Sequence, residues 1–231
     1  MFGLLNGATK LHDKKVEMSA DSTKGMEGLP QSLPAKPFFF ILIGPPGSGK
    51  SNLLMNLLTN KKLYGRKFEL VHWFSPSMST ITIPLPKAHL HDTLNLSIIE
   101  KTTKQLKKDE RALFVFDDMV VDIQKSMKPF LKLAYNRRHL GGAGVSMIVS
   151  TQKLTKIDLA IRAAASAIFF WKTQNKKEIK SFYDEFISLD YNVFLKLLDY
   201  VWDKPHNFLY IRLDVSEDER YHKNFDLIKV Q

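Results

Sequence analysis

The residues with the clearest capacity for chemistry stand in one segment, GPPGSGKS, which spans Gly44 to Ser51. Its spacing, G-x-x-x-x-G-K-[ST], is typical of a phosphate-binding loop, in which glycines let successive backbone N–H groups point at an anion. Lys50 is predicted to contact the β- and γ-phosphates of a nucleotide, and the Ser51 hydroxyl is predicted to bind Mg²⁺. The residues predicted to bind the nucleotide are Gly44, Pro45, Pro46, Gly47, Ser48, Gly49, Lys50, Ser51 and Asn52.

Two carboxylates supply the second half of this predicted site. Asp117 and Asp118 follow five apolar residues, Ala112–Phe116, which predict a buried strand. Because ligands of open α/β sheets bind at the carboxyl ends of the strands, we expect this strand to lie beside the one that leads into the phosphate loop. Asp117 is then predicted to hold Mg²⁺, and Asp118 to polarise the attacking water. The alternative is that both aspartates only terminate a strand, because Asp is common in turns.

Further side chains are candidates for sensing or stabilising the γ-phosphate. Gln152 follows the apolar run Val145–Ser150, and a Gln at such a strand end is suited to bind the γ-phosphate or the water. Arg138 and Arg137 precede the same run and are candidates for an arginine finger that acts on the next subunit's γ-phosphate, with Arg162 as a second candidate. The alternatives are a solvated strand end for Gln152 and a helix-dipole interaction for the arginines.

The elements that must position these side chains alternate between strands and helices. Short apolar runs bounded by turn residues predict buried strands, and amphipathic stretches predict helices. The predicted strands cover 38–43, 68–74, 94–99, 112–116, 145–150 and 167–171, and the predicted helices include 52–58, 129–139, 155–164 and 190–202. Two strand-like runs, 207–214 and 221–230, predict a C-terminal β-hairpin. This order predicts an α/β fold with a mostly parallel sheet and flanking helices.

Composition suggests how the chain is divided. The segment 1–36 is rich in Gly, Ser, Lys and Met and is predicted to be a loosely ordered arm. Residues 37–231 are predicted to form one phosphate-loop domain, which includes the hairpin at 207–230. No apolar run is long enough to span a bilayer, and the first residues lack a long apolar signal core. With 0 cysteines, disulfides and Cys-based metal sites are excluded.

Charge points to the kind of partner. The net charge of +10 favours polyanions, nucleic acid first. Basic residues recur at 61–62, 66–67, 104–108 and 125–128, and the alternative for each is an ordinary solvated surface. The histidines show no spacing suited to a metal, and we expect His89 and His91 to be solvated.

Other nucleotide-dependent classes fit the sequence less well. A GTPase would carry N-K-x-D after the fifth core strand, but NKKE at 175–178 has Glu in the last place. We expect a capping box there, in which Asn175 caps a helix and Glu178 folds back. No D-x-x-G follows the Asp117 strand, and no S-G-G-Q-like signature of ABC ATPases precedes it. A small-molecule kinase would have no need of a second carboxylate beside Asp117.

Taken together, the motifs resemble a known family. The segments that carry the resemblance are ILIGPPGSGKSNLL, VHWFSP, ALFVFDDM, AYNRRHLGGAGVSMIVSTQ, DLAIRAAASAIFFW and NFLYIRLD…YHKNFDLIKV. They resemble the DNA-packaging ATPases of large eukaryotic DNA viruses of poxvirus type and of virophages, within the FtsK–HerA class of DNA translocases. The resemblance runs from about Phe38 to the C-terminus. The Lys50 and Asp117 motifs are shared by P-loop ATPases in general. The arginine–histidine segment and the C-terminal hairpin are the features that restrict the resemblance to this family.

The resemblance implies a RecA-like P-loop NTPase fold, ATP and Mg²⁺ as cofactors, and a homo-oligomeric ring of six or five subunits. It implies that ATP hydrolysis threads double-stranded DNA, independently of sequence, into a preformed capsid, with capsid or portal-vertex proteins as partners. The location it implies is the virion or the viral factory in the host cytoplasm. The alternatives are a nucleotide-regulated interaction protein, or a translocase or helicase of this class that does not package genomes.

For the site, the resemblance implies the roles given above, with Gln152 as the γ-phosphate sensor and Arg138 preferred to Arg137 as the finger. Asp118 departs from the Glu that bacterial relatives have at this position, so the resemblance by itself does not identify Asp118 as the catalytic base.

Overall fold

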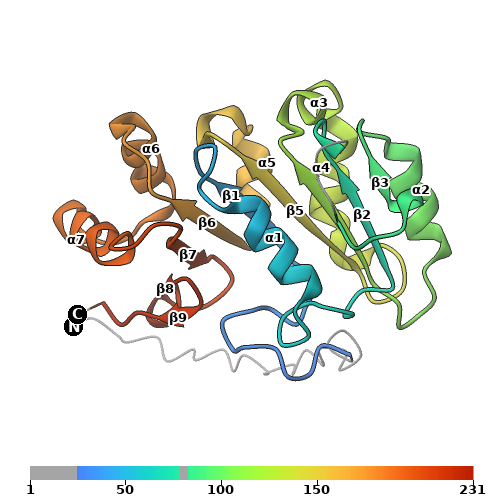
Figure 1. Ribbon diagram of the computed structural model, residues 1–231, viewed down its shortest axis with the longest axis horizontal. Coiled ribbons are helices and arrows are strands. Elements are labelled where there is room, and N and C mark those ends of the chain that lie inside the picture. The colour runs from blue at the N-terminus through green and yellow to red at the C-terminus, as the bar shows by residue number, and fades with distance from the viewer. Residues whose placement is uncertain (1–24, 79–82, 231) are drawn as a thin grey trace, which may run out of the picture.

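The structure is a computed structural model that describes residues 25–78 and 83–230, in which nine strands form one sheet with helices on both faces (Figure 1). The strand order is β3-β2-β4-β5-β1-β6-β7-β8-β9. The strands are β1 Phe39–Ile43, β2 Leu70–Phe74, β3 Leu90–His91, β4 Ala112–Asp117, β5 Val145–Thr151, β6 Ala167–Trp171, β7 Phe208–Arg212, β8 Tyr221–Lys223 and β9 Asp226–Leu227. The pairs from β3 to β6 are parallel and those from β6 to β9 are antiparallel.

Helices connect the strands across the sheet. The α-helices are α1 Lys50–Thr59, α2 Leu96–Gln105, α3 Val120–Lys125, α4 Met127–Asn136, α5 Leu159–Ala163, α6 Lys176–Phe186 and α7 Tyr191–Val201. Short 3₁₀ helices are η3 Lys87–His89, η4 Arg137–His139, η5 Leu154–Lys156 and η6 Glu217–Glu219. Figure 1 shows α1 in front of the sheet, crossing β1 and β5. None of the helices in the described ranges is long and apolar enough to cross a membrane.

Both faces of the central strands are buried, which explains their unbroken apolar sequences. In β1, Phe39, Ile41 and Ile43 pack into a core shared with α3 to α7. The alternate residues Phe40 and Leu42 pack into a second core shared with α1. Successive strand residues point to opposite faces, so a strand between two layers must be apolar at every position. The predicted α/β fold with a mostly parallel sheet, flanking helices and a C-terminal antiparallel hairpin is confirmed.

The strand order corrects one expectation. The Asp117 strand does not lie beside β1, because β5 pairs in parallel with both β4 and β1 and separates them. The carboxyl ends of the three strands still meet at one edge, where Asp117 is in register with Ser150, and Thr151 with Ile43. Gln152, which follows β5, therefore lies between the phosphate loop and the carboxylates.

Three predicted elements differ from the structure. The strand expected at 94–99 is the start of α2, because the Asn95 side chain accepts the backbone N–H of Ser97 and caps a helix. The helix expected at 155–164 is split into η5 and α5, and the Asp158 side chain caps the second part. The strand expected at 221–230 is divided into β8 and β9 at Asn224, whose φ of 55° turns the chain.

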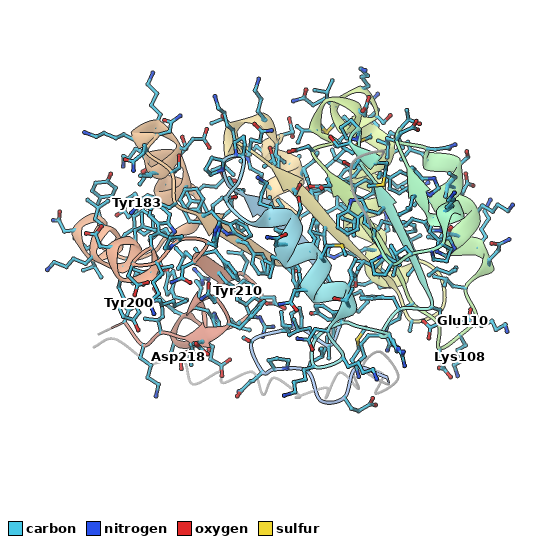
Figure 2. All side chains as sticks on the ribbon, in the orientation of Figure 1. Lys108, Glu110, Tyr183, Tyr200, Tyr210 and Asp218 are labelled. Carbon is cyan, nitrogen blue, oxygen red and sulfur yellow. The ribbon has the colours of Figure 1, made fainter. Side chains whose placement is uncertain are left out.

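The predicted N-terminal arm falls partly on residues 1–24, which lie outside the described residues. The part that the structure describes, 25–36, packs on the α1 face of the sheet, where Met26 and Leu33 are buried. The Tyr64 hydroxyl donates to the Pro34 carbonyl at 2.8 Å, and the Tyr210 hydroxyl donates to the carbonyl of Ser32 at 2.7 Å. Tyr210 is labelled at the centre of Figure 2. The division of the chain at residue 36 stays a prediction.

Candidate active site

The phosphate loop joins the carboxyl end of β1 to the first residue of α1. Gly47 and Gly49 have positive φ angles of 73° and 105°, which side chains rarely adopt, so glycine is needed at both. Gly44 needs the space of a glycine, because a Cβ there would lie 2.7 Å from Ser48 Oγ and 2.8 Å from Trp171 Cβ. The Gly44 N–H donates to the carbonyl of Thr151 at 3.1 Å, which ties the start of the loop to β5.

Lys50 is buried at the first position of α1. Its Nζ donates to the Gly44 carbonyl at 2.6 Å and to the Pro45 carbonyl at 3.2 Å, so the side chain folds over the loop. Burial lowers the pKa of the Lys50 ammonium, and the carboxylates of Asp118 and Asp117 oppose that change. The positive charge of Lys50 is thus placed between the phosphate loop and the two aspartates, where it can stabilise an anion.

Asp117 lies at the end of β4 and is buried. Ser150 Oγ donates a hydrogen bond to Asp117 Oδ1, and the Ser51 hydroxyl is near enough to the carboxylate to lower its pKa. Burial is the largest influence on the pKa of Asp117 and raises it, and the neighbouring Asp118 adds to that rise. The bond from Ser150, and the nearby Lys50 and Ser51, act in the opposite direction. The two residues predicted to bind Mg²⁺ therefore lie close together, although they are far apart in the sequence.

The donors of this pair fit Mg²⁺, which prefers hard oxygen ligands and is usually held by one or two protein groups together with phosphates and water. A hydroxyl and a partly desolvated carboxylate supply such oxygens. Across 25–78 and 83–230, no three His, Cys, Asp or Glu side chains are grouped so that they could hold a metal ion by themselves. A metal at Ser51 and Asp117 would therefore depend on the nucleotide for further ligands.

Asp118 is exposed and has a left-handed backbone with φ 56°. Its N–H is shared between the carbonyl and the Oγ of Ser150, each at 3.3 Å. Gln152 Nε2 lies 3.4 Å from Asp118 Oδ2, which brings the predicted base and the predicted sensor together. Asp and Asn adopt this backbone conformation more readily than most residues, so the local geometry explains why Asp stands here in place of Glu.

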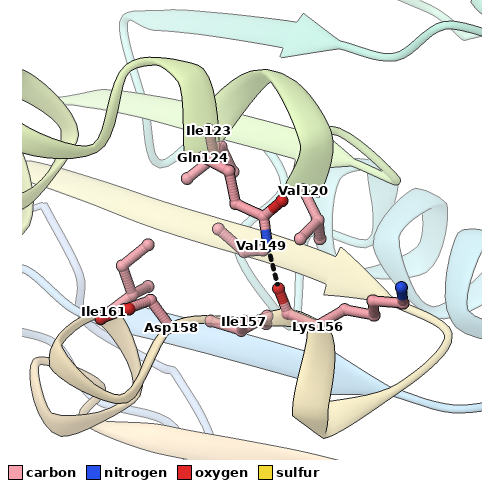
Figure 3. Close-up of a pocket in the computed structure, with 8 residues that line it drawn as sticks. All are labelled: Val120, Ile123, Gln124, Val149, Lys156, Ile157, Asp158 and Ile161. Carbon is pink, nitrogen blue, oxygen red and sulfur yellow. Dashed lines mark hydrogen bonds between the residues drawn. The ribbon is translucent and has the colours of Figure 1, made fainter.

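Two contacts that the sequence analysis missed hold the segment after Gln152. Glu178 was expected to fold back onto its own helix cap, but its carboxylate accepts the Leu154 N–H at 2.8 Å and the Thr155 hydroxyl at 2.9 Å. Asn175 does cap α6, as predicted. Gln124 Nε2 donates to the carbonyl of Lys156 at 2.9 Å, across a small pocket between α3 and η5 (Figure 3).

These contacts join the chain segments on either side of the site. Helix α3 follows Asp118, and η5 follows Gln152, so the bond drawn in Figure 3 links the two segments that carry the predicted base and sensor. Ser150 was also missed as a site residue, although a hydroxyl near the carboxyl end of a buried strand was an available signal. Glu178 gave no such signal, because its partners are remote in sequence.

The arginines lie away from this cluster. Arg137 and Arg138 form η4, which precedes β5 and therefore lies at the amino edge of the sheet, opposite Gln152. Arg137 is buried and donates to the Ala134 carbonyl at 2.7 Å, and burial together with Arg138 lowers the pKa of Arg137 to about 10. Arg138 is exposed. Arg162 forms an ion pair with Glu185. Only Arg138 of these is placed to reach another molecule.

The expectation for the histidines of β3 and η3 was wrong. His89 and His91 are partly buried and pack against His72, with ring centroids 4.8 Å and 5.2 Å away. His72 Nδ1 lies 2.9 Å from His91 Nε2, and its Nε2 lies 3.0 Å from the Thr102 hydroxyl. Burial, with His89 and His91, lowers the pKa of His72 to about 4. These contacts are internal to the fold.

Comparisons with known proteins support the architecture. No protein-family model matches the sequence, and no curated protein matches it either. Among solved structures, the genome packaging NTPase B204 from Sulfolobus turreted icosahedral virus 2, in complex with ATPγS, is 15% identical, with 83% of this chain and 98% of that chain covered and a TM-score of 0.57.

Two further structures are similar. The DNA-packaging ATPase B204 from Sulfolobus turreted icosahedral virus is 18% identical, with 77% of this chain and 94% of that chain covered and a TM-score of 0.56. The pCW3 conjugation coupling protein TcpA, in its monomer form with ATPγS, is 12% identical, with 83% and 61% covered and a TM-score of 0.53. At these identities the likeness shows the fold, which is that of the RecA-like P-loop NTPases.

Proposed function

We propose that this protein is an ATP-hydrolysing motor that moves double-stranded viral DNA into a preformed capsid. The observation that carries the proposal is the meeting of Ser51, Asp117 and Lys50 at one edge of the sheet, with Asp118 and Gln152 beside them. A phosphate loop alone would serve binding, whereas a second carboxylate and an amide next to it are suited to positioning a water for attack on the γ-phosphate. The solved packaging NTPases with the same fold support this choice.

Each side chain has a defined part in this proposal. The loop N–H groups and Lys50 bind the phosphates. Ser51 and Asp117 hold Mg²⁺, which would neutralise charge on the phosphate oxygens when bound. Asp118 accepts a hydrogen bond from the attacking water, and Gln152, through its contact with Asp118, orients that water and registers the γ-phosphate.

The site of one subunit is incomplete without a neighbour. Among the described residues, the candidate finger Arg138 lies at the opposite edge of the sheet from Asp118 and Gln152. A finger at that place can act only on the site of another copy, so the proposal includes a ring of six or five subunits in which Arg138 completes the next site.

Basic segments on the amino edge are suited to hold DNA. Residues 61–62 follow the end of α1 and precede β2, and residues 104–108 precede β4, so both segments lie at the edge where the parallel strands begin. Lys108 is seen at that edge in Figure 2. Lysines grip phosphates without reading bases, as a motor that moves along any sequence requires.

The sequence motifs support a more specific family assignment. We propose the poxvirus-type and virophage group of packaging ATPases in the FtsK–HerA class, with capsid or portal-vertex proteins as partners and a location in the viral factory of the host cytoplasm or in the virion. The pairing of NRRH before β5 with a C-terminal hairpin supports this group over P-loop ATPases in general.

The test is the rate of ATP hydrolysis with and without duplex DNA, with native mass measured in the same buffer. We expect that the active species is larger than the 26.6 kDa chain. Duplex DNA should raise its rate of ATP hydrolysis, and this stimulation should disappear as the salt concentration rises. Hydrolysis that ignores DNA of every length would remove the translocation proposal. ATP bound but never cleaved would favour a nucleotide-regulated interaction protein.

A further inference from the structure

A cleft of about 390 Å³ opens beside the phosphate loop. One wall is the loop itself, residues 45–48, and the other is the segment 202–207, which joins α7 to β7. We call residues 202–207 the strap. The cleft is also lined by Trp171, the last residue of β6. The strap thus brings the C-terminal part of the chain against a loop that is more than 150 residues away in sequence.

The strap is fixed at several points. Trp202 Nε1 donates to the Phe170 carbonyl at 3.3 Å, and Trp171 Nε1 donates to the carbonyl of His206 at 3.1 Å. The Asn207 side chain donates to Asp203 at 2.9 Å. These bonds hold the strap to β6 and to itself, so the strap residue that hydrogen-bonds the loop is held from behind.

That residue is His206. Its φ is 67°, a left-handed conformation that is uncommon outside glycine and in which Asn, Asp and His are enriched. His206 Nδ1 lies 3.2 Å from the Ser48 carbonyl oxygen, and because that oxygen only accepts, Nδ1 carries the proton. The ring also covers Gly49, since a Cβ on Gly49 would lie 3.4 Å from Nδ1.

The contact fixes one peptide unit of the loop. The Ser48 carbonyl and the Gly49 N–H belong to the same planar trans peptide, so they point in opposite directions. When His206 holds the carbonyl on its side, the Gly49 N–H is directed away from the strap. Backbone N–H groups of the glycine-rich loop are the donors that bind phosphate, and glycine backbones rotate easily between orientations.

We propose that His206 is a positioning residue of the nucleotide site, which holds the Ser48–Gly49 peptide in the orientation that binds phosphate. This inference rests on the proposed function and goes beyond it by assigning a residue outside every nucleotide-binding motif. It also makes the strap the point at which the C-terminal hairpin is mechanically connected to bound nucleotide.

The test is a pair of substitutions, one that keeps a hydrogen-bond donor at position 206 and one that removes it. His206→Asn keeps a side chain that tolerates positive φ and can donate through its amide, whereas His206→Gly tolerates the backbone and removes the donor. Arg66→Gly is the matched control, because Arg66 is exposed, has a φ of 65° and lies in the connection between α1 and β2. Binding of a non-hydrolysable ATP analogue and of inorganic tripolyphosphate to the full chain is measured by calorimetry, and melting by circular dichroism confirms that each variant is folded.

We expect His206→Gly to weaken binding of both ligands about two- to tenfold, the effect of one hydrogen bond. We expect His206→Asn and Arg66→Gly to stay within about twofold of wild type. Unchanged binding by folded His206→Gly overturns the inference. A loss seen with the ATP analogue and absent with tripolyphosphate also overturns it, because His206 would then contact the nucleoside. If wild type binds neither ligand, the proposed function itself fails.

Discussion

The two edges of the sheet differ in how their functional groups are held. At the carboxyl edge, Asp117 and Lys50 are buried and hydrogen-bonded by the protein. At the amino edge, the basic residues of 61–62 and Arg138 are exposed. The groups at the carboxyl edge are arranged to bind a small ligand. The exposed positive charges at the amino edge are free to interact with another molecule.

Under the proposed function, the two edges have different tasks. Chemistry needs groups fixed to within fractions of an ångström, so it is placed where three parallel strands end together. Contact with a long polyanion, or with the next subunit, tolerates mobile side chains. The exceptions at each edge are instructive: Asp118 is exposed among the fixed groups, and Arg137 is buried among the exposed ones.

The largest effect is expected from removing the amino-edge group that would act in trans. Arg138→Ala should lower ATP turnover in the assembled ring by about 10³–10⁵-fold, because an arginine finger stabilises charge that develops only in the transition state. ATP binding to the same variant should stay unchanged, since Arg138 is remote from its own subunit's phosphate loop. Turnover and nucleotide affinity are measured side by side.

A mixing experiment decides whether the two edges meet between subunits. Arg138→Ala and Asp118→Asn should each be inactive alone, but a random 1:1 mixture should recover activity at up to about a quarter of the sites, where one variant supplies the finger and the other the base. His139→Ala, which changes the exposed neighbour of Arg138, should behave as wild type. A mixture as inactive as its components would mean that Arg138 does not act across subunits.

The next largest effect is expected at the exposed member of the carboxyl edge. Asp118→Asn keeps the left-handed backbone and loses the base, so turnover should fall by about 10²–10⁴-fold without loss of stability. Asp118→Glu keeps the carboxylate but should cost about 1 kcal/mol of stability, because a longer side chain without the local bonding of Asp is disfavoured at positive φ. Turnover and thermal melting separate the two.

The outcome against this interpretation is specific. A Glu variant that melts with wild type and turns over faster would show that the backbone at 118 adapts, and that the left-handed conformation does not select Asp. An Asn variant that retains turnover would remove Asp118 from the mechanism and leave the site a nucleotide-binding site.

The smallest effect is expected from the amino-edge lysines. Replacing Lys61 and Lys62 together by Ala should leave basal turnover unchanged and reduce the slope of log affinity for duplex DNA against log salt by about 2, one unit for each DNA phosphate that the protein no longer neutralises. The matched control is the pair Lys176 and Lys177, equally exposed but at the start of α6, on the carboxyl edge. Equal changes for the two pairs would abolish the distinction between the edges.

The parts of the site that the sequence predicted are those defined by local spacing. The phosphate loop, Asp117 and Gln152 each follow a buried apolar run, and any parallel sheet brings such strand ends to one edge. The order of the strands within the sheet could not be predicted from local spacing. The insertion of β5 between β4 and β1 depends on how the connecting segments cross the sheet, and strand composition does not encode it.

Other features were missed because they depend on remote partners. Glu178 looked like a helix cap from its neighbours, yet it binds the segment after Gln152, which reaches it only once β5 and α6 are in place. His206 gave no sign of its contact with Ser48. At 94–99 the apolar run was too short to separate strand from helix, and the cap at Asn95 decided the outcome.

Strand β7 runs against its neighbours, and this gives the C-terminal segment two ends with different surroundings. It begins just after His206 at the phosphate loop and ends before Asp214, whose charge acts on Arg137 at the far edge. It is hydrogen-bonded to β6 on one side and to β8 on the other, over a length of about 17 Å. The strand therefore forms a continuous hydrogen-bonded connection from the segment that contacts the phosphate loop to the surroundings of Arg137, which directly precedes the candidate finger Arg138.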